Sequence, residues 1–480
     1  MTLRPIERIE GSNLYEQVAN RIETLIAEGT LQPGDRLPSV RKLHQQMSVS
    51  ISTALEAYRL LEDRGFIGAK PQSGYFVRQF KSRPEPERSS PRQEACCVDT
   101  SLVFQVNAML HDPEIIQLGA AVPGMDLLPL SALNRLMGQV LRQDPILAHG
   151  YTPPPGRIEF RRAVARRMLD ADCTVSPDQI VATNGTTEAV YLSLQAATQP
   201  GDTVAIASPS YYGLLEALES LHLRALELPT HPREGICLEA LETALKRHSI
   251  AACALVSNFS NPLGTRMSDE KKEELVELLT QYQVPLVEDD VYGDLAFNGD
   301  RPKALKAFDR DGLVLYCSSY SKVLSPGLRV GWSIPGRYQT KIERLKLTAN
   351  MTTCPANQLA IAAFLANGGY DRHLRQLRRA YEQQMIQMIQ AICDYFPEET
   401  KVTHPSGGHV LWVELPPQFD TMELFSAASH YKISISPGIM FSPSGCYGNC
   451  FRLNSGLPWS PKLERAMELL GQLIRDRLAD

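Results

Sequence analysis

The sequence contains no uninterrupted apolar run that approaches the length needed to span a membrane. Its first eight residues, Met1 to Arg8, also have no apolar core like that of a signal peptide. These two absences argue against a membrane protein and against a secreted one. We therefore expect a cytoplasmic protein with no membrane partner.

An excess of positive charge is missing as well. The chain has 49 Lys and Arg residues against 54 Asp and Glu residues, which gives a formal charge of -5 and a pI near 6.1. This balance excludes a global basic signature for nucleic acid or for an anionic membrane surface. Any contact with DNA must therefore come from a local patch.

Clusters of cysteine are also absent. The ten cysteines are scattered, apart from the neighbours Cys96 and Cys97 and the pair Cys446 and Cys450. Neither pair is accompanied by a cluster of His or Cys at zinc-finger spacing. We therefore predict reduced, mostly buried thiols rather than disulfides, and we assign no metal.

The length of 480 residues exceeds what one core usually holds, so we expect two or more domains. The stretch from Lys81 to Thr100 is rich in proline and mixed charge, has little to bury, and predicts an exposed, fairly stiff tether. We place a first domain at residues 12–80, a linker at 81–110 and a larger domain at 111–480. The tether would let the first domain sit apart from the larger one and move relative to it.

In the first domain, the spacing of apolar residues and the positions of turn residues predict three short helices followed by a hairpin. Apolar residues at helical spacing run from Leu14 to Ile26. Pro38-Ser39 opens a second short helix, and the tight turn Ser48-Val49-Ser50 leads into a third. Two short helices joined by such a turn suit a helix-turn-helix. Two strands around a glycine turn, at residues 66–67 and 75–77, follow as a wing.

Within this domain, residues 31–43, Ala57-Tyr58 and residues 73–77 resemble the GntR-type winged helix, which covers nearly all of residues 12–78. Ile51 stands where the family pattern usually has an arginine, and an apolar contact to a thymine methyl is open to it. The alternative is a three-helix module kept for protein contacts. The resemblance implies binding of double-stranded DNA, with phosphate or base contacts from Arg36, Ser39 and Arg41 and, at the start of the recognition helix, from Ser50, Ser52 and Thr53.

Beyond the linker, short apolar runs alternate with amphipathic helical patterns such as Glu188 to Ala197 and Asp269 to Tyr282. This alternation predicts an α/β fold with a mostly parallel sheet that is covered by helices on both faces. Ligands bind such sheets at the carboxyl ends of the strands. The predicted strands are residues 179–183, 203–207, 251–256, 285–287 and 313–316.

A polar motif follows each predicted strand immediately, so all five motifs should converge on one edge of the sheet. The motifs are residues 184–188, 209–212, 258–264, 288–292 and 319–322. The last motif contains Lys322, and Arg329 follows seven residues later. A lysine can be a Schiff-base nucleophile when partial burial deprotonates it, whereas an arginine stays charged and holds phosphate or carboxylate through two hydrogen bonds. A carbonyl cofactor with a phosphate would need both side chains. The alternative is an ordinary polar connection after the strand, in which the lysine is simply solvated.

Taken together, the five motifs resemble those of pyridoxal-phosphate enzymes of the aspartate-aminotransferase fold type, over essentially all of residues 110–480. The resemblance implies a fold-type I domain with a small C-terminal subdomain, pyridoxal 5'-phosphate as cofactor, and a two-fold dimer. It implies that Lys322 forms a Schiff base and serves as general base, and that Asp289 pairs with the protonated pyridine nitrogen. The other implied contacts are Tyr292 and Asn261 with the phenolic oxygen, Tyr211 with the ring face, Gly185, Thr186, Ser319 and Arg329 with the phosphate, Tyr151 with the phosphate across the dimer, and Arg452 with an amino acid's carboxylate.

Each of these residues also has an ordinary structural explanation when it is taken alone. Asp289 could cap a helix, and Asn261 before a proline is a common turn former. Arg452 could belong to a surface ion pair. The occurrence of several motifs in order, each after a predicted strand, favours the cofactor site over these explanations.

A winged helix joined by a tether to an aminotransferase-like domain is the arrangement of the MocR-type regulators of the GntR family, which this chain resembles from end to end. The resemblance implies a homodimeric transcription regulator whose cofactor-bearing domain senses an amino compound or the cofactor itself. Two alternatives remain open. One is a working aminotransferase with an accessory winged helix, and the other is a DNA-binding protein whose second domain no longer binds cofactor.

Overall fold

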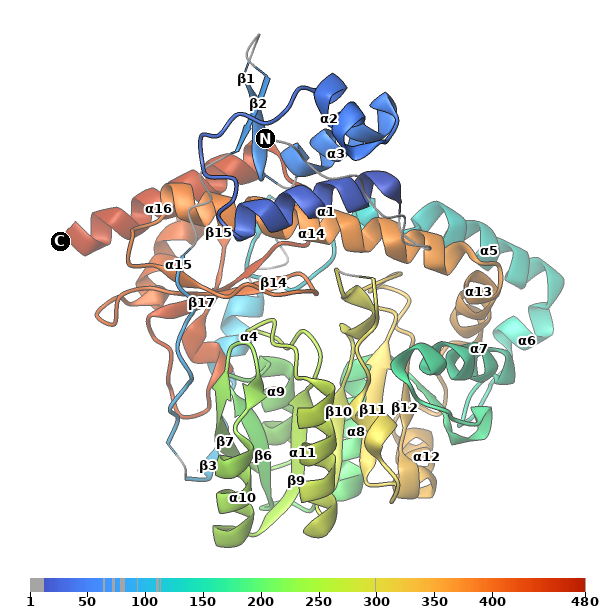
Figure 1. Ribbon diagram of the computed structural model, residues 1–480. Coiled ribbons are helices and arrows are strands. Elements are labelled where there is room, and N and C mark those ends of the chain that lie inside the picture. Colours follow the sequence, from blue (N-terminus) through green and yellow to red (C-terminus); the bar gives the residue numbers. More distant parts are fainter. Residues whose placement is uncertain are drawn as a thin grey trace.

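Figure 1 shows the computed structural model, which describes residues 13–63, 65–70, 74–77, 83–92, 94–108, 112, 114–297 and 299–479. The predicted domain boundaries at residues 12, 80, 81, 110 and 111 and the turn at residues 71–73 lie outside the described residues. None of the helices in the described ranges is both long enough and apolar enough to cross a lipid bilayer.

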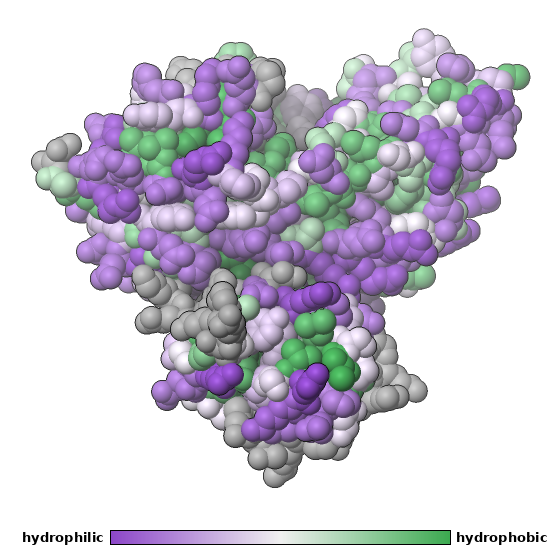
Figure 2. Space-filling view, turned by 90° about the horizontal axis from the view of Figure 1, so that it is seen from above, coloured by the Kyte–Doolittle hydropathy of each residue, from purple (hydrophilic) through white to green (hydrophobic). Residues whose placement is uncertain are grey.

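The N-terminal part is a winged helix, as the spacing of its apolar residues predicted. Its helices pack on one core that includes Val18, Leu43 and Tyr58, all of them buried. Ser39 caps the second helix by accepting a hydrogen bond from the Lys42 N–H at 3.3 Å. The elements are α1 (Leu14–Ala27), α2 (Val40–Met47), α3 (Ile51–Asp63), β1 (Ile67–Lys70) and β2 (Gly74–Val77). This winged helix forms a small lobe that projects from the larger body (Figure 2).

The larger part is built on a central sheet with nine strands among the described residues. Its order is β3-β7-β6-β9-β10-β11-β12-β5, with β8 paired to β7. The five strands from β7 to β11 in this order are parallel, and β12 is antiparallel to both of its neighbours. The strands are β3 (Cys96–Cys97), β5 (Val181–Thr183), β6 (Thr203–Ser208), β7 (Arg224–His231), β8 (Gly235–Ile236), β9 (Ile250–Val256), β10 (Leu286–Asp289), β11 (Val314–Ser319) and β12 (Gly331–Ile334).

Helices cover both faces of this sheet, because its strands carry apolar residues on both sides. On one face, Ala205 and Leu286 pack against α10 and α11. On the other face, Ile206 and Val287 pack against α8 and α9. These helices are α8 (Thr186–Ala197), α9 (Tyr212–Ser220), α10 (Leu238–Arg247) and α11 (Asp269–Gln281). The predicted α/β class with a mostly parallel, doubly covered sheet is confirmed.

A second sheet and its helices form a C-terminal subdomain with its own core around Trp412, Phe451 and Leu470. The sheet order is β13-β14-β17-β16. Its strands are β13 (Lys401–Val402), β14 (Val410–Glu414), β16 (Ser436–Pro437) and β17 (Cys450–Asn454), and β15 (Ile433–Ser434) pairs with β4 (Ile116–Gln117). The remaining helices are α4 (Ser101–Ala108), α5 (Leu130–Gln143), α6 (Pro145–His149), α7 (Ile158–Met168), α12 (Gln339–Asn350), α13 (Pro355–Ala366), α14 (Gly369–Tyr395), α15 (Thr421–His430) and α16 (Pro461–Ala479).

The linker is fastened to the larger part, and this corrects the expectation of an exposed tether. The Pro84 carbonyl accepts a hydrogen bond from the Val402 N–H at 3.0 Å. Pro86 and Pro91 are buried, and β3 adds to the edge of β7 as an antiparallel strand. The composition of the linker gave no sign of these contacts because its partners lie more than a hundred residues away in the sequence.

The winged helix rests on α14, the long helix that runs beneath α1 (Figure 1). Glu16 of α1 forms an ion pair with Arg379 of α14. Farther along α14, the Ile386 side chain would lie 3.7 Å from a Cβ placed on Gly65, which comes just before the hairpin. The winged helix therefore rests on the larger part in this structure.

Candidate functional site

The predicted site residues gather where the parallel strands of the central sheet end. Asp289 is the last residue of β10 and Ser319 is the last residue of β11. A cavity of about 230 Å³ opens there. Of the predicted residues, those that line it are Thr186, Tyr211, Asn261, Asp289, Tyr292, Ser319, Lys322 and Arg329.

Lys322 extends into this cavity from the loop after β11. Its Nζ donates a hydrogen bond to the Ala121 carbonyl at 2.6 Å and lies 6.0 Å from the centre of the Tyr292 ring. Burial, together with the positive charge of Arg452, lowers the pKa of Lys322 to about 8. A lysine with such a pKa is neutral far more often than a solvated one, and only the neutral amine is a nucleophile.

Asp289 presents a carboxyl group to the same cavity. Burial raises the pKa of Asp289 to about 7, and the neighbouring charge of Asp290 adds to this rise. The Val291 N–H, 3.1 Å from Oδ1, and the charge of Lys322 act in the opposite direction. Because burial penalises the charged carboxylate, a cation placed beside it would be bound favourably.

The N-terminus of α8 and Arg329 form a cradle suited to an anion. Gly185, with a φ of +87°, caps α8, and a Cβ at this position would lie 2.4 Å from Nη2 of Arg329. That guanidinium is held by the Asn184 carbonyl at 3.0 Å and by the Ser321 hydroxyl at 3.2 Å. The buried hydroxyl of Thr186 has no hydrogen-bond partner among the described residues. Helix N–H groups, a guanidinium and a free hydroxyl are the donors that a phosphate needs.

Four further predicted residues form the walls around Lys322. Tyr292 is buried, which raises its pKa above the usual range, and it is hydrogen-bonded to the side chain of Asn261. The Tyr211 ring lies 4.9 Å from that of Tyr212, at an angle of 47°. Ser319 accepts a hydrogen bond from the Ser321 N–H at 3.3 Å. Two phenols and an amide therefore face the space between Lys322 and Asp289.

Arg452 lies directly behind this wall and does not line the cavity. It is fully buried on β17, and its Nη1 donates to Asn261 Oδ1 at 2.8 Å. Nη2 donates to the Gly119 carbonyl and to the Ser436 hydroxyl, whereas Nε has no partner among the described residues. A carboxylate that reached Arg452 could accept from this free Nε–H, or it could replace Asn261 or Gly119 as the acceptor of an Nη group.

Tyr151 lies apart from the cavity. Its side chain is 81% exposed, so it contributes nothing to this site within one chain. The neighbouring Thr152 carbonyl accepts a hydrogen bond from Thr352, which follows the exposed Met351. The predicted contact of Tyr151 with a phosphate across a dimer remains a prediction.

Sequence reasoning missed two polar side chains of the site. Ser321 is buried and holds Arg329, although only Ser319 was assigned a role. His409 is fully buried beside the Tyr292 ring, at 5.5 Å, and its Nδ1 is 2.9 Å from Asn454 Oδ1. Burial and the charge of Lys322 lower the pKa of His409 to about 3, so it is neutral. A lone histidine directly before the apolar run of β14 (Val410–Glu414) was the available signal.

The residues predicted to contact DNA lie on the projecting lobe. Arg36, Ser39, Arg41, Ser50 and Ser52 are exposed, and Thr53 is half-buried. Ser50 also accepts a hydrogen bond from the Thr53 N–H at 3.0 Å and so caps α3. Ser39 and Ser50 thus have structural roles at helix starts, and their contact with DNA remains a prediction.

Comparison with known proteins covers both parts of the chain. Residues 14–77 match the family described as bacterial regulatory proteins, gntR family, and residues 114–468 match aminotransferase class I and II. YdcR of Escherichia coli (strain K12), an uncharacterized HTH-type transcriptional regulator, is 43% identical over 97% of this chain and 99% of its own. YjiR of the same strain, also an uncharacterized HTH-type transcriptional regulator, is 38% identical over 96% of this chain and 98% of its own.

A solved structure supports the assignment of the larger part. The crystal structure of LysN, an α-aminoadipate aminotransferase of Thermus thermophilus, superposes with a TM-score of 0.73 at 27% identity over 80% of this chain and 96% of its own. The larger part alone is similar to aminotransferases. The whole chain, with its winged helix, is similar to proteins named as transcriptional regulators. The chain belongs to the GntR-family HTH-type regulators that carry an aminotransferase class I and II domain, the MocR-type arrangement.

Proposed function

We propose that this protein is a cytoplasmic, DNA-binding transcription regulator whose aminotransferase-like domain holds pyridoxal 5'-phosphate and senses an amino compound. The observation that carries the proposal is the joining of a GntR winged helix and an aminotransferase-like domain in one chain that aligns with regulator-named relatives over nearly its whole length. The effector would bind at the cavity that holds Lys322, and DNA would bind at the projecting lobe.

The residues of the cavity fit this cofactor. The Thr186 hydroxyl, the N-terminus of α8 and Arg329 fit a phosphate. Asp289, with its raised pKa, fits a protonated pyridine nitrogen, and Lys322, with its lowered pKa, fits an aldehyde. When bound, the cofactor would supply an electron sink for bonds at the amine-bearing carbon of an amino compound.

The protein's own side chains would bind and orient the effector. Lys322 Nζ can hold or release a proton near pH 8 at a position that faces the Tyr292 ring. Arg452 is the cation placed to take a carboxylate, since it can exchange Asn261 for a ligand oxygen. An amino acid, which carries both an amine and a carboxylate, is therefore the effector class that these two side chains suit best.

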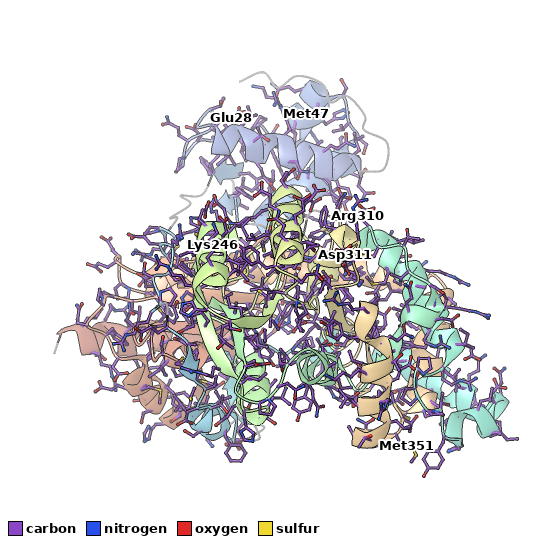
Figure 3. The ribbon with its side chains drawn as sticks, turned by 90° about the horizontal axis from the view of Figure 1, so that it is seen from below. Glu28, Met47, Lys246, Arg310, Asp311 and Met351 are labelled. Atoms are coloured by element: carbon purple, nitrogen blue, oxygen red, sulfur yellow. The ribbon has the colours of Figure 1, made fainter. Side chains whose placement is uncertain are left out.

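A second copy of the chain is part of the proposal. Large apolar side chains are exposed near Tyr151: Ile146 is 85% exposed, and Leu347 and Met351 are about half exposed. Met351 lies at the opposite end of the molecule from Glu28 and Met47 of the winged helix (Figure 3). A two-fold dimer through this surface would bring Tyr151 to a partner's cavity and leave both DNA-binding lobes free.

An active aminotransferase with an accessory winged helix is the second candidate. It is favoured by the completeness of the residue set around Lys322 and by the likeness to LysN. Mixing the pyridoxal-phosphate-loaded protein with an amino acid and a keto acid separates the two candidates. Repeated cycling would favour the aminotransferase, and a single half-reaction or none would favour the regulator.

The proposal is tested by footprinting on the DNA that flanks the protein's own coding region, with and without candidate amino acids. We expect a protected site whose affinity or extent changes with one class of amino acid, and the spacing of half-sites would report the geometry of the dimer. A protein that gains no absorbance band when pyridoxal phosphate is added would support the third alternative, in which the larger domain no longer binds cofactor.

A further inference from the structure

We infer that residues 83–89, which we call the strap, couple ligand binding at Arg452 to the winged helix by bridging the central sheet and the C-terminal subdomain. This inference rests on the proposed function and names the route by which the same site would regulate DNA binding. The strap begins six residues after Val77, the last residue of β2, so only five residues of the chain separate it from the winged helix.

The first end of the strap is fixed to the C-terminal subdomain. Arg83 donates hydrogen bonds to the carbonyls of Glu398 at 2.7 Å and Phe396 at 2.8 Å, just beyond the C-terminal end of α14. The next residue, Pro84, accepts a hydrogen bond from the Val402 N–H of β13. Carbonyls at a helix C-terminus are favourable partners for a guanidinium, so this anchor is strong.

The other end of the strap is fixed to the central sheet. The Ser89 hydroxyl donates to the Ser208 carbonyl at 2.7 Å and accepts from the Thr230 N–H at 2.7 Å. The Ser89 N–H donates to the Thr230 carbonyl at 3.0 Å. Ser208 ends β6, three residues before Tyr211 of the cavity. The second anchor therefore lies at the base of a loop that forms one wall of the cavity.

A buried carboxylate joins the same two parts beside the second anchor. Glu227 of the central sheet is 1% exposed. It accepts hydrogen bonds from the Ser208 hydroxyl at 2.6 Å and from the Ser442 hydroxyl of the C-terminal subdomain at 3.1 Å. The residue before Ser442 is Phe441, whose ring lies 5.1 Å from the guanidinium of Arg452. A continuous series of contacts thus links Arg452 to the anchor of the strap.

The binding residues are divided between these two parts in the same way. Asp289 ends β10 and Lys322 follows β11 of the central sheet, whereas Arg452 lies on β17 of the C-terminal subdomain. A ligand that contacts Lys322 and Arg452 together favours one relative position of the two parts, and the strap spans the same junction. Because coupling free energies are reciprocal, a ligand that holds the two parts in one relative position also holds the strap at its two anchors.

The test uses two stable ligands that differ only in a carboxylate, N-(5'-phosphopyridoxyl)-L-alanine and N-(5'-phosphopyridoxyl)ethylamine. Each is added to the full-length protein after removal of bound cofactor, and its binding is measured by calorimetry. Hydrogen exchange at the Ser89 amide is then followed by mass spectrometry. We expect the alanine compound to slow this exchange by about five-fold or more relative to the ethylamine compound, which is the lower end of usual allosteric couplings. Equal exchange with both ligands bound would overturn the inference.

Variants of the strap give a second readout in DNA affinity. In the parent protein, DNA affinity should differ between the two ligands by about five-fold or more. In Ser89→Ala and in Arg83→Ala, which each release one anchor, this difference should vanish. Ser90→Ala, a change at the exposed neighbour of Ser89, is the matched control and should keep it. A difference that persists in both anchor variants would also overturn the inference.

The two proposals fail in different ways. A parent protein that binds neither ligand contradicts the proposed function and the strap together. A parent protein that binds both ligands, changes its DNA affinity and yet shows no change at Ser89 contradicts the strap alone.

Discussion

Glu16 of α1 forms an ion pair with Arg379 of α14, so the winged helix is held by the same helix that contacts the loop containing Lys322. Six residues earlier on α14, His373 lies 2.6 Å from the carbonyl of Val323, the residue after Lys322. Arg379 is 54% exposed and Glu16 is 20% exposed, so the pair is a contact at the protein surface. It can orient the winged helix without adding much to the stability of the fold.

Reversing one charge of this pair should loosen the winged helix. Exposed ion pairs are worth about 0 to 1 kcal/mol, so Arg379→Glu should change the free energy of unfolding by no more than about 1 kcal/mol. The two carboxylates would then repel each other, and small-angle X-ray scattering should show a larger radius of gyration. The double variant Glu16→Arg with Arg379→Glu should restore the parent value. Identical scattering from the single and double variants would show that this contact does not seat the module.

Lys322→Ala should separate DNA binding from sensing. The variant lacks the amine at the centre of the cavity, so we expect no absorbance band with pyridoxal phosphate and no response of DNA affinity to amino acids. Its basal DNA affinity should match the parent within about two-fold, because the winged helix is untouched and distant substitutions act independently. Fluorescence anisotropy with operator DNA measures both quantities. An unchanged response to amino acids would count against Lys322 as the sensing group.

Asp289→Asn should flatten the pH dependence of stability in the cofactor-free protein. The pKa of Asp289 is raised to about 7 in the folded chain, against about 3.9 for an unfolded one. The folded state therefore holds an extra proton between these values, and its stabilising effect is lost as the pH rises towards 7. The parent should lose up to about 1.4 kcal/mol per pH unit relative to the variant across this window. Urea unfolding at pH 5, 6 and 7 measures the difference, and parallel profiles would contradict it.

Gly185→Ala should weaken cofactor binding beyond its effect on the backbone. Gly185 has a φ of +87°, where a side chain costs roughly 1–2 kcal/mol, and its Cβ would also displace the guanidinium of Arg329. We expect affinity for pyridoxal phosphate to fall by about ten-fold, equivalent to about 1.4 kcal/mol. Gly201→Ala is the matched control, since its φ is +90° and its Cβ would meet nothing within 4 Å. An equal loss of affinity in both variants would show that displacement of Arg329 does not cause the loss.

Arg41→Ala should weaken DNA binding in a salt-dependent way. If Arg41 neutralises one phosphate, the slope of log affinity against log salt should become shallower by about one. The control is Arg310→Ala, because Arg310 is exposed and belongs to the larger body, in the segment before β11. Anisotropy titrations at several salt concentrations measure both slopes. A slope that is unchanged in Arg41→Ala would remove this residue from the interface.

The central part of the site could be predicted because strand ends are visible in the sequence. Asp289 and Ser319 close apolar runs, and the structure places both at strand ends on the cavity. Local pattern and chain order therefore suffice for residues that lie on one sheet. The winged helix was predictable for the same reason, since each of its elements is set by spacing within about ten residues.

Contacts between distant segments could not be predicted in this way. The position of Arg452 behind Asn261 depends on how β17 packs against the central sheet, and no local sequence pattern predicts that packing. Its two other acceptors include the Gly119 carbonyl, a backbone atom that leaves no signal in residue type. The linker was misjudged for the same reason, because its proline and charge content describes an isolated chain, whereas Val402 and Thr230 supply its partners.

The pairing of β3 with β7 decides where the larger domain can be cut out as a separate protein. Cys96 and Cys97 cover Arg224 and Ala225 at the edge of the central sheet. A fragment that began at the predicted domain start, near residue 111, would leave the backbone N–H and C=O groups of this part of β7 unpaired, and such edges promote aggregation between molecules. A fragment that begins at Arg83 keeps both the edge strand and the strap, and it is the version to express when ligand binding at the Lys322 cavity is studied without the winged helix.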